Sequence, residues 1–251
     1  MSKPKLRADS FEITTHELSI DGLAEAHHGL RIAQLTDLHI GPTPHARIRN
    51  AIDAIHAADV DLVVLTGDYL THSAWRLPLI RPALADLRVP TVAVLGNHDH
   101  FCGAPRVRAA LESAKIVVLQ NERERFVVNG EPITVFGVDD GVTRHDDVER
   151  AFSGGPSSGT RIVLFHSPPT IDKLPPNQDL LAFAGHTHGG QIVIPRFTQA
   201  VANRIGQPYL AGHFRVRGNR LYVARGLGFG RGTLVPRIGA DPELSLFQLA
   251  S

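Results

Sequence analysis

The sequence predicts an α/β fold organised as a single domain over residues 1–251. Short apolar, β-branched runs that are typical of buried strands recur along the chain, and each ends in a polar cluster. Segments with helical spacing follow the first of these runs, and this alternation of strand and helix favours parallel βαβ units. Hydrophobic residues make up 43% of the 251 residues, which is enough to bury a substantial core.

Six runs are predicted strands, in the order RIAQL from Arg31, DLVVL from Asp61, TVAVL from Thr91, ITVFGV from Ile133, RIVLF from Arg161 and LLAFA from Leu180. Between the first two, the apolar residues at positions 48, 51, 52, 55 and 58 predict a helix. A second helix is expected from Pro105, which suits a first turn, to Ala114. Nearer the C-terminus, we expect a more meandering sheet from QIVIP (191–195), RLYVA (220–224) and LSLFQLA (244–250).

Composition excludes several classes of protein. The single cysteine, Cys102, rules out an intramolecular disulfide framework and a thiolate-rich zinc site. The N-terminal residues carry basic side chains without an apolar run behind them, so we expect no signal peptide. No later segment approaches the roughly 20 apolar residues that a membrane-spanning helix needs. We therefore expect a cytoplasmic protein without an integral membrane segment.

Charge is distributed unevenly along the chain. Residues 180–240 contain no Asp or Glu, although the whole chain carries a net charge of only +1. This stretch holds eight arginines: Arg196, Arg204, Arg215, Arg217, Arg220, Arg225, Arg231 and Arg237. One interpretation is contact with an anionic substrate or an anionic lipid surface, and the other is a solvated outer face of a sheet. Aromatic residues are few and scattered here, so binding of nucleic acid by base stacking is not favoured.

The residues suited to chemistry follow the predicted strands directly. They form the clusters TDLH (36–39), GD (67–68), GNHD (96–99), FH (165–166) and GHTH (185–188). In open α/β sheets, ligands bind at the carboxyl ends of the strands, so these five clusters are expected to meet at one edge. Asp, Asn and His donors without thiolates suit Mn²⁺, Fe or Zn²⁺. A shared carboxylate can bridge two such ions, an arrangement typical of in-line displacement at phosphorus.

These clusters, in this order, resemble the calcineurin-like metallophosphoesterase family over roughly residues 30–250. The resemblance implies two packed mixed β-sheets flanked by helices, a four-layer α-β-β-α sandwich. It also implies two divalent metal ions, with Mn²⁺ expected first and Fe or Zn²⁺ as alternatives, held by seven ligands. One metal would be held by Asp37, His39 and His188, the other by Asn97, His166 and His186, and Asp68 would bridge the two.

The family also implies the roles of the remaining residues. A metal-bridging hydroxide would attack phosphorus, His98 would protonate the leaving oxygen, and Asp99 would hold the imidazole of His98 in place. Arg225, which precedes a glycine-rich stretch, is a candidate for a bidentate contact with the substrate phosphate. Gly189 and Gly190 either let the backbone approach that phosphate or simply form a turn, and we favour the turn.

Within the family, GHTHGGQ (185–191), ARGLG (224–228) and PRIGADPEL (236–244) resemble the bacterial YkuE/YaeI-type phosphodiesterase group. A phosphodiesterase is therefore the expected activity, and the oligomeric state is not predicted. One alternative is a pyrophosphatase acting on a lipid of the UDP-2,3-diacylglucosamine type. Another is a non-catalytic scaffold on the same fold, which retention of all seven ligands and His98 argues against. An apolar lid around Trp75 is weighed against ordinary packing, which is favoured.

Overall fold

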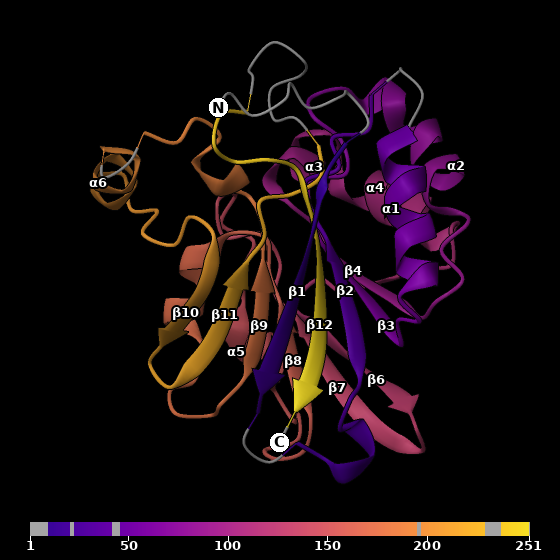
Figure 1. Cartoon of the computed structure of the whole chain (residues 1–251), viewed down its shortest axis with the longest axis vertical. Helices are drawn as coiled ribbons and strands as arrows, with labels where there is room; N and C mark the ends of the chain where they lie inside the picture. Colours follow the sequence, from indigo (N-terminus) through magenta and orange to yellow (C-terminus); the bar gives the residue numbers. More distant parts are fainter. Residues whose placement is uncertain (1–9, 21–22, 42–45, 195–196, 229–236, 251) are drawn as a thin grey trace, which may run out of the picture.

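Two six-stranded sheets form the centre of the protein (Figure 1). The computed structural model describes residues 10–20, 23–41, 46–194, 197–228 and 237–250. The first sheet has the order β1 (Glu12–Ser19), β12 (Glu243–Ala250), β2 (Arg31–Leu35), β3 (Leu62–Thr66), β4 (Thr91–Val94) and β5 (Val117–Val118). The second has the order β10 (Gly212–Val216), β11 (Asn219–Val223), β9 (Leu181–Ala184), β8 (Arg161–Leu164), β7 (Glu131–Gly137) and β6 (Glu122–Val128).

Both sheets are mixed, with a parallel centre. Strands β2 to β5 run parallel, whereas β12 pairs antiparallel with β2 and parallel with β1. In the second sheet β7, β8, β9 and β11 run parallel, and β6 and β10 are antiparallel edges. Since neighbouring parallel strands end on the same side, the polar clusters that follow them are brought together.

The faces of the two sheets pack against each other, and helices cover both outer faces. The inner cluster joins side chains of both sheets, such as Ile32 and Val64 of the first and Ile162 and Phe183 of the second. The described residues contain six α-helices: α1 (Ala46–Ala57), α2 (Ile80–Leu84), α3 (Asn97–Phe101), α4 (Ala104–Glu112), α5 (Val148–Phe152) and α6 (Phe197–Arg204). Apolar side chains of α1, α2 and α4 pack on the first sheet, and those of α5 on the second. This is the expected four-layer sandwich.

Helix α1 follows from its sequence pattern, because its apolar positions Ile48, Ala51, Ile52 and Ile55 are all buried on one side. Helix α4 begins one residue before the predicted Pro105 and ends two residues before Ala114. All six predicted strands are present. Among the described residues, no helix is long and apolar enough to cross a membrane.

The expectation of a meandering C-terminal sheet was wrong in two respects. Strand β11, from the RLYVA run, pairs parallel with β9, and β12, from LSLFQLA, crosses to the other sheet and lies between β1 and β2. In the described part of QIVIP, residues 191–194, only an isolated bridge from Ile192 to Ile238 is formed. Strand β11 occupies the place beside β9, and residues 191–194 form no strand of either sheet.

Candidate metal centre

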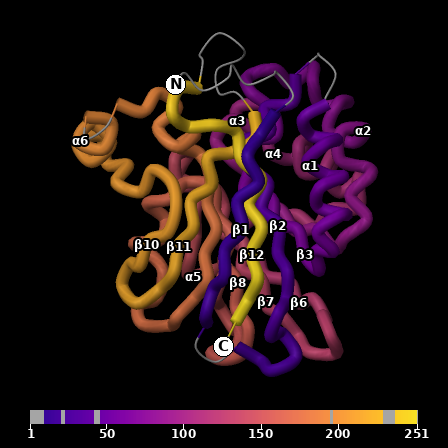
Figure 2. Tube along the Cα trace, in the orientation of Figure 1, coloured from indigo at the N-terminus to yellow at the C-terminus, as the bar shows by residue number. Residues whose placement is uncertain are grey.

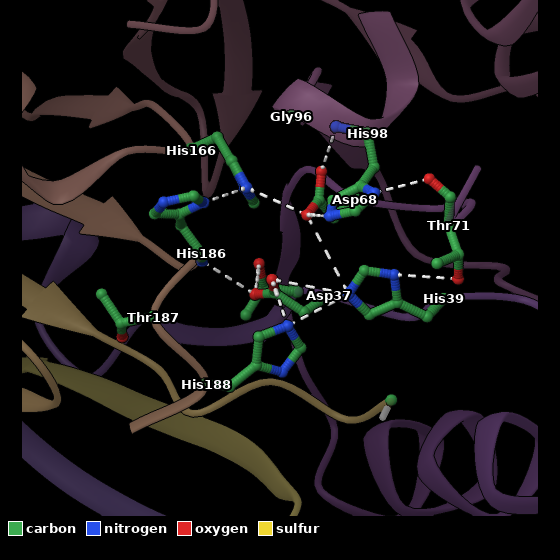
Figure 3. Close-up of polar contacts among 12 residues, drawn as sticks. Asp37, His39, Asp68, Thr71, Gly96, His98, His166, His186, Thr187 and His188 are labelled. Atoms are coloured by element: carbon green, nitrogen blue, oxygen red, sulfur yellow. Dashed lines mark hydrogen bonds and ion pairs between the residues drawn. The ribbon is translucent and has the colours of Figure 1, made fainter. Parts of the chain in front are cut away.

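The five polar clusters meet at one end of the two sheets (Figure 3). The residues after β2, β3 and β4 belong to the first sheet, and those after β8 and β9 to the second. Hydrogen bonds join the two sets across the sheets: His166 Nδ1 lies 2.7 Å from the carbonyl oxygen of Thr66, and the amide of His186 donates to Asp37 Oδ2 at 3.0 Å. The convergence expected from the sequence is thus observed.

Two groups of donor atoms lie side by side at this end of the protein. In the first, Asp37, His39 and His188 place one ligand atom each within 4.8 Å of the others, and Nε2 of His39 lies 3.1 Å from Nε2 of His188. In the second, Asp68, His166 and His186 meet the same limit. Each group can hold a metal ion, so the fold provides two neighbouring sites of the kind that the sequence predicts.

Asp68 lies between the two groups. Its Oδ2 atom is 3.2 Å from Nε2 of His166 in one group and 3.9 Å from Nε2 of His39 in the other. Asn97 joins the second group, because its Oδ1 atom lies 3.1 Å from Nδ1 of His186. All seven predicted ligands are therefore gathered, and Asp68 has the position that a bridging carboxylate needs.

The backbone of this site is unusual. Five of the seven predicted ligands have positive φ angles, namely Asp37 (51°), His39 (44°), Asp68 (57°), His186 (71°) and His188 (51°). The left-handed region is sparsely populated by residues other than glycine, and such conformations concentrate at functional sites. All five lie where the chain leaves β2, β3 or β9.

Two glycines make room for the carboxylates. A Cβ atom at Gly96 would lie 2.2 Å from Asp68 Oδ1, and one at Gly185 would lie 2.1 Å from Thr36 Oγ1 and 2.5 Å from Asp37 Oδ2. Real Cβ atoms essentially never approach other heavy atoms so closely. The glycines of the GNHD and GHTH clusters are thus required because each backbone packs directly against a predicted metal-binding carboxylate.

The second ring nitrogen is also engaged in three of the four predicted imidazole ligands. His166 Nδ1 donates to the carbonyl oxygen of Thr66, which leaves Nε2 free to act as a ligand. His39 Nδ1 faces the hydroxyl of Thr71 at 3.3 Å. His188 Nδ1 lies 2.7 Å from the guanidinium of Arg237, which can only donate. That contact must loosen if Nε2 of His188 binds a cation, because Nδ1 then has to carry the ring proton.

The charges of the two groups suit a cation. Burial alone would raise the pKa of Asp37, but His188 and His166 lower it. Burial would also raise the pKa of Asp68, and neighbouring imidazoles, His166 first, hold it well below its usual range. Burial lowers the pKa of His188 to about 3. Ionised carboxylates beside a neutral imidazole are the protonation state that a divalent metal ion requires.

The donor set passes a further test of fit to a metal ion. Oδ1 of Asp37 is buried and has no hydrogen-bond partner among the described residues. A buried carboxylate oxygen without a partner is costly, and a cation would satisfy it. Burial would lower the pKa of His166, but the Asp68 carboxylate raises it to about 10. A cation bound to Nε2 would displace that proton and take over its charge.

His98 lies beside this centre as predicted, but Asp99 does not contact its ring. His98 Nδ1 donates to the carbonyl oxygen of Thr71 at 2.5 Å, and its Nε2 lies 3.9 Å from Asp68 Oδ2. Asp99 instead accepts hydrogen bonds from the backbone amides of residues 68, 69, 70 and 96. The Asp99 carboxylate therefore joins the two loops after β3 and β4, and we call these four hydrogen bonds the Asp99 bracket. The carbonyl oxygen of Thr71 holds the imidazole of His98.

The guanidinium of Arg225 forms ion pairs with two carboxylates. Its Nε donates to Glu243 Oε2 at 2.9 Å, and its NH2 group lies 2.7 Å from Glu12 Oε2. Gly189, predicted to form a turn, has a φ of 63° and packs against the Arg225 side chain. Arg237, which sequence reasoning did not single out, reaches His188; its presence in PRIGADPEL was the signal available.

Comparison with known proteins matches this chain to one family and to several relatives. The model of the family described as calcineurin-like phosphoesterase matches residues 30–190. Metallophosphoesterase YkuE of Bacillus subtilis is 28% identical over 258 residues, which cover 98% of this chain and 88% of YkuE. YkoQ, a metallophosphoesterase of the same organism, is 28% identical over 262 residues, which cover 98% of this chain and 93% of YkoQ. The UDP-2,3-diacylglucosamine pyrophosphatase LpxG of Chlamydia trachomatis is 26% identical over 278 residues, which cover 88% of this chain and 84% of LpxG.

Proposed function

The chain belongs to the calcineurin-like phosphoesterase family, and from this premise we propose that it is a dinuclear phosphodiesterase whose metals are held by the seven predicted ligands. It is a metal-dependent hydrolase of phosphate esters. The observation that carries the proposal is the position of the Asp68 carboxylate, which faces His166 in one donor group and His39 in the other. A carboxylate between two donor groups is suited to join two ions.

In the proposed centre, one ion is held by Asp37, His39 and His188, the other by Asn97, His166 and His186, and both by Asp68. When bound, two such ions supply Lewis acidity at the phosphoryl oxygens and lower the pKa of water, which is the chemistry of in-line displacement at phosphorus. Mn²⁺ is the proposed metal, with Fe or Zn²⁺ as alternatives, because oxygen and imidazole donors suit all three.

His98 is proposed to protonate the leaving oxygen from Nε2. Its Nδ1–H is committed to the carbonyl oxygen of Thr71, so the ring cannot turn without losing a hydrogen bond. This orientation directs Nε2 toward Asp68, 3.9 Å away, and so toward the place where a phosphoryl group would meet the ions. Asp99 supports this arrangement indirectly, through the amides that fix the loop from Asp68 to Leu70.

The substrate is proposed to be a phosphodiester. A pyrophosphatase activity on a UDP-linked diacylated sugar is a second candidate, favoured by the likeness to LpxG over most of both chains. Arg225 is proposed as a phosphate contact only if substrate draws its guanidinium away from Glu12, the more exposed of its two acidic partners. A cytoplasmic location and contact with anionic lipid also belong to the proposal.

Replacing Asp68 by Ala tests this function. We expect Asp68→Ala to lose bound metal and turnover together, whereas Asp53→Ala, at an exposed position of α1, keeps both. Metal content is measured by mass spectrometry after loading with Mn²⁺, Fe or Zn²⁺. Turnover is measured on an aryl phosphodiester, an aryl phosphomonoester and UDP-2,3-diacylglucosamine. Full activity of Asp68→Ala would contradict the proposed centre, and activity on the UDP-lipid alone would replace the diesterase by the second candidate.

A further inference from the structure

Helix α6 exposes its large apolar side chains. Phe197, Val201 and Ile205 are 62%, 41% and 68% exposed. They are spaced four residues apart, so they form one stripe along the helix and its C-terminal end. The neighbouring stripe, made of Thr198 and Ala202, faces the protein: Ala202 is buried and the Thr198 hydroxyl donates to the carbonyl oxygen of Ile192. A helix of a soluble protein ordinarily buries its largest apolar residues, and α6 does the reverse.

Further exposed isoleucines extend this stripe. Ile194 leads into α6, and Ile192 forms a β-bridge with Ile238. We call the set the α6 apolar face, and it consists of Ile192, Ile194, Phe197, Val201, Ile205 and Ile238. These are six of the eleven exposed large hydrophobic residues in the described part of the chain. Scattered exposed apolar residues need no explanation, whereas six on one helix and on the two segments bonded next to it indicate an interaction surface.

The α6 apolar face lies next to the metal centre. Helix α6 packs on the loop that carries His188, because a Cβ atom at Gly190 would lie 2.8 Å from Thr198 Cγ2. The same loop is tied to the segment after α6 by a hydrogen bond from the Thr187 hydroxyl to the carbonyl oxygen of Leu210. Figures 1 and 2 show α6 at the same end of the molecule as α3, which begins at Asn97.

The charge of the chain around α6 indicates the kind of partner that this face binds. Between Asp179 and Asp241 the sequence contains no carboxylate side chain, and α6 carries Arg204 in its last turn. An anionic surface would therefore meet a cation and no opposing carboxylate from this segment. The apolar stripe of an amphipathic helix can enter the boundary between headgroups and acyl chains, and each Lys or Arg near an anionic leaflet adds to the attraction.

We propose that the α6 apolar face docks the protein on the surface of an anionic phospholipid bilayer. The apolar stripe enters the headgroup boundary, and Arg204 meets lipid phosphate. This surface deepens the proposed contact with anionic lipid by naming the face that makes it, and it does not depend on the proposed phosphodiesterase activity. Its consequence, that the substrate is a phosphate ester presented at the membrane surface, does rest on the proposed function, because it requires the neighbouring centre to be the active site.

Co-sedimentation with vesicles tests the proposal. The vesicles contain phosphatidylcholine alone or with one third phosphatidylglycerol, and the protein is the full chain. We expect binding to the anionic vesicles, a loss of at least tenfold in partitioning for the combined Phe197→Ser, Val201→Ser, Ile205→Ser variant, and a loss of several-fold for Arg204→Glu. The matched control combines Ile13→Ser, Val127→Ser and Val142→Ser, three exposed apolar positions elsewhere, and should bind like the unmodified chain.

Turnover of a small soluble phosphodiester separates this proposal from the proposed function. The stripe variant should retain full turnover on it, which also shows that the variant is folded; circular dichroism checks folding if the chain has no such activity. The proposal is overturned if the unmodified chain does not bind anionic vesicles, or if the stripe variant binds as well as the control. It is also overturned if light scattering shows a dimer that the stripe variant converts to monomers, since the face then joins two copies.

Discussion

Replacing Asp99 by Asn tests whether this carboxylate supports the backbone or orients a catalytic imidazole. Asp99 is fully buried, and its Oδ2 accepts from the amides of Asp68 at 2.8 Å and Gly96 at 2.9 Å. Its Oδ1 accepts from the amides of Tyr69 at 3.0 Å and Leu70 at 3.3 Å. Together, these contacts tie the segment after β3 to the segment after β4.

The size of the effect follows from counting acceptors. Asn has one carbonyl oxygen in place of two carboxylate oxygens, so its NH₂ group must face two of the four backbone N–H groups. Burial raises the pKa of Asp99 to about 7, so the comparison is made above that pH, where the carboxylate is ionised. Each hydrogen bond to a charged group contributes about 1.5–3 kcal/mol, so the loss of two lowers the free energy of unfolding by roughly 3–6 kcal/mol. In a chain of this size 1 kcal/mol corresponds to about 2–4 °C, so the melting temperature should fall by roughly 6–24 °C.

Thermal unfolding measured by circular dichroism in the presence of a chelator gives the stability without a contribution from bound metal. The control is Asp53→Asn on the exposed side of α1, which should melt like the unmodified chain. The competing role, orientation of His98, predicts the opposite pattern: near-normal stability with activity lost on esters that have poor leaving groups. An Asp99→Asn variant that melts within about 2 °C of the unmodified chain would refute the bracket assigned here.

Three further substitutions test the site and its surroundings. Burial alone would raise the pKa of Glu243, but hydrogen bonds lower it to about 2 from 4.5. Its ionised form therefore stabilises the fold fully above pH 4.5, and about 3 kcal/mol is lost as pH falls through 2, so the stability gap to Glu243→Gln should close over that range in pH-dependent unfolding. His98→Ala should keep its metal and lose roughly 10²–10⁴-fold in kcat on alkyl esters but less on aryl esters; equal losses would count against His98 as the acid. Gly185→Ala should lose metal affinity in equilibrium dialysis, because its methyl group would lie 2.1 Å from Thr36 Oγ1 and 2.5 Å from Asp37 Oδ2, and unchanged affinity would show that the loop can yield.

The strands could be predicted because parallel strands buried on both faces are apolar along their whole length. LLAFA shows this pattern, and all four residues of β9 are apolar and buried. Which strands pair with each other in a sheet could not be predicted in the same way. LSLFQLA is nearly all apolar, and nothing in its periodicity states that β12 lies between β1 and β2. The apolar run in QIVIP resembles a short strand, but its described residues join neither sheet and form only the bridge to Ile238.

The residue types of the site could be predicted, but not the contacts that fix them. Asp, His and Asn after strand ends are visible in the sequence, and the structure gathers all seven. The carbonyl groups of Thr66 and Thr71, which orient His166 and His98, leave no trace in the sequence because any residue supplies a carbonyl. The family resemblance implied that Asp99 orients the neighbouring imidazole of His98. In a helix, however, consecutive side chains point in different directions, and Asp99 faces the backbone of the next loop.

The arrangement of the ligands also explains why this end of the sheets depends on so many backbone contacts. Five ligands adopt left-handed conformations, each costing about 1 kcal/mol or more, and the buried carboxylate of Asp68 lies close enough to Asp37 to act against the lowering of its pKa. Without further contacts, loops with this backbone strain would relax to ordinary conformations. The Asp99 bracket, the glycines that admit the carboxylates and the Thr66 carbonyl prevent this by fixing the backbone from which the ligands project. A site held in this way is already shaped for cations, so binding energy is not spent on ordering its loops.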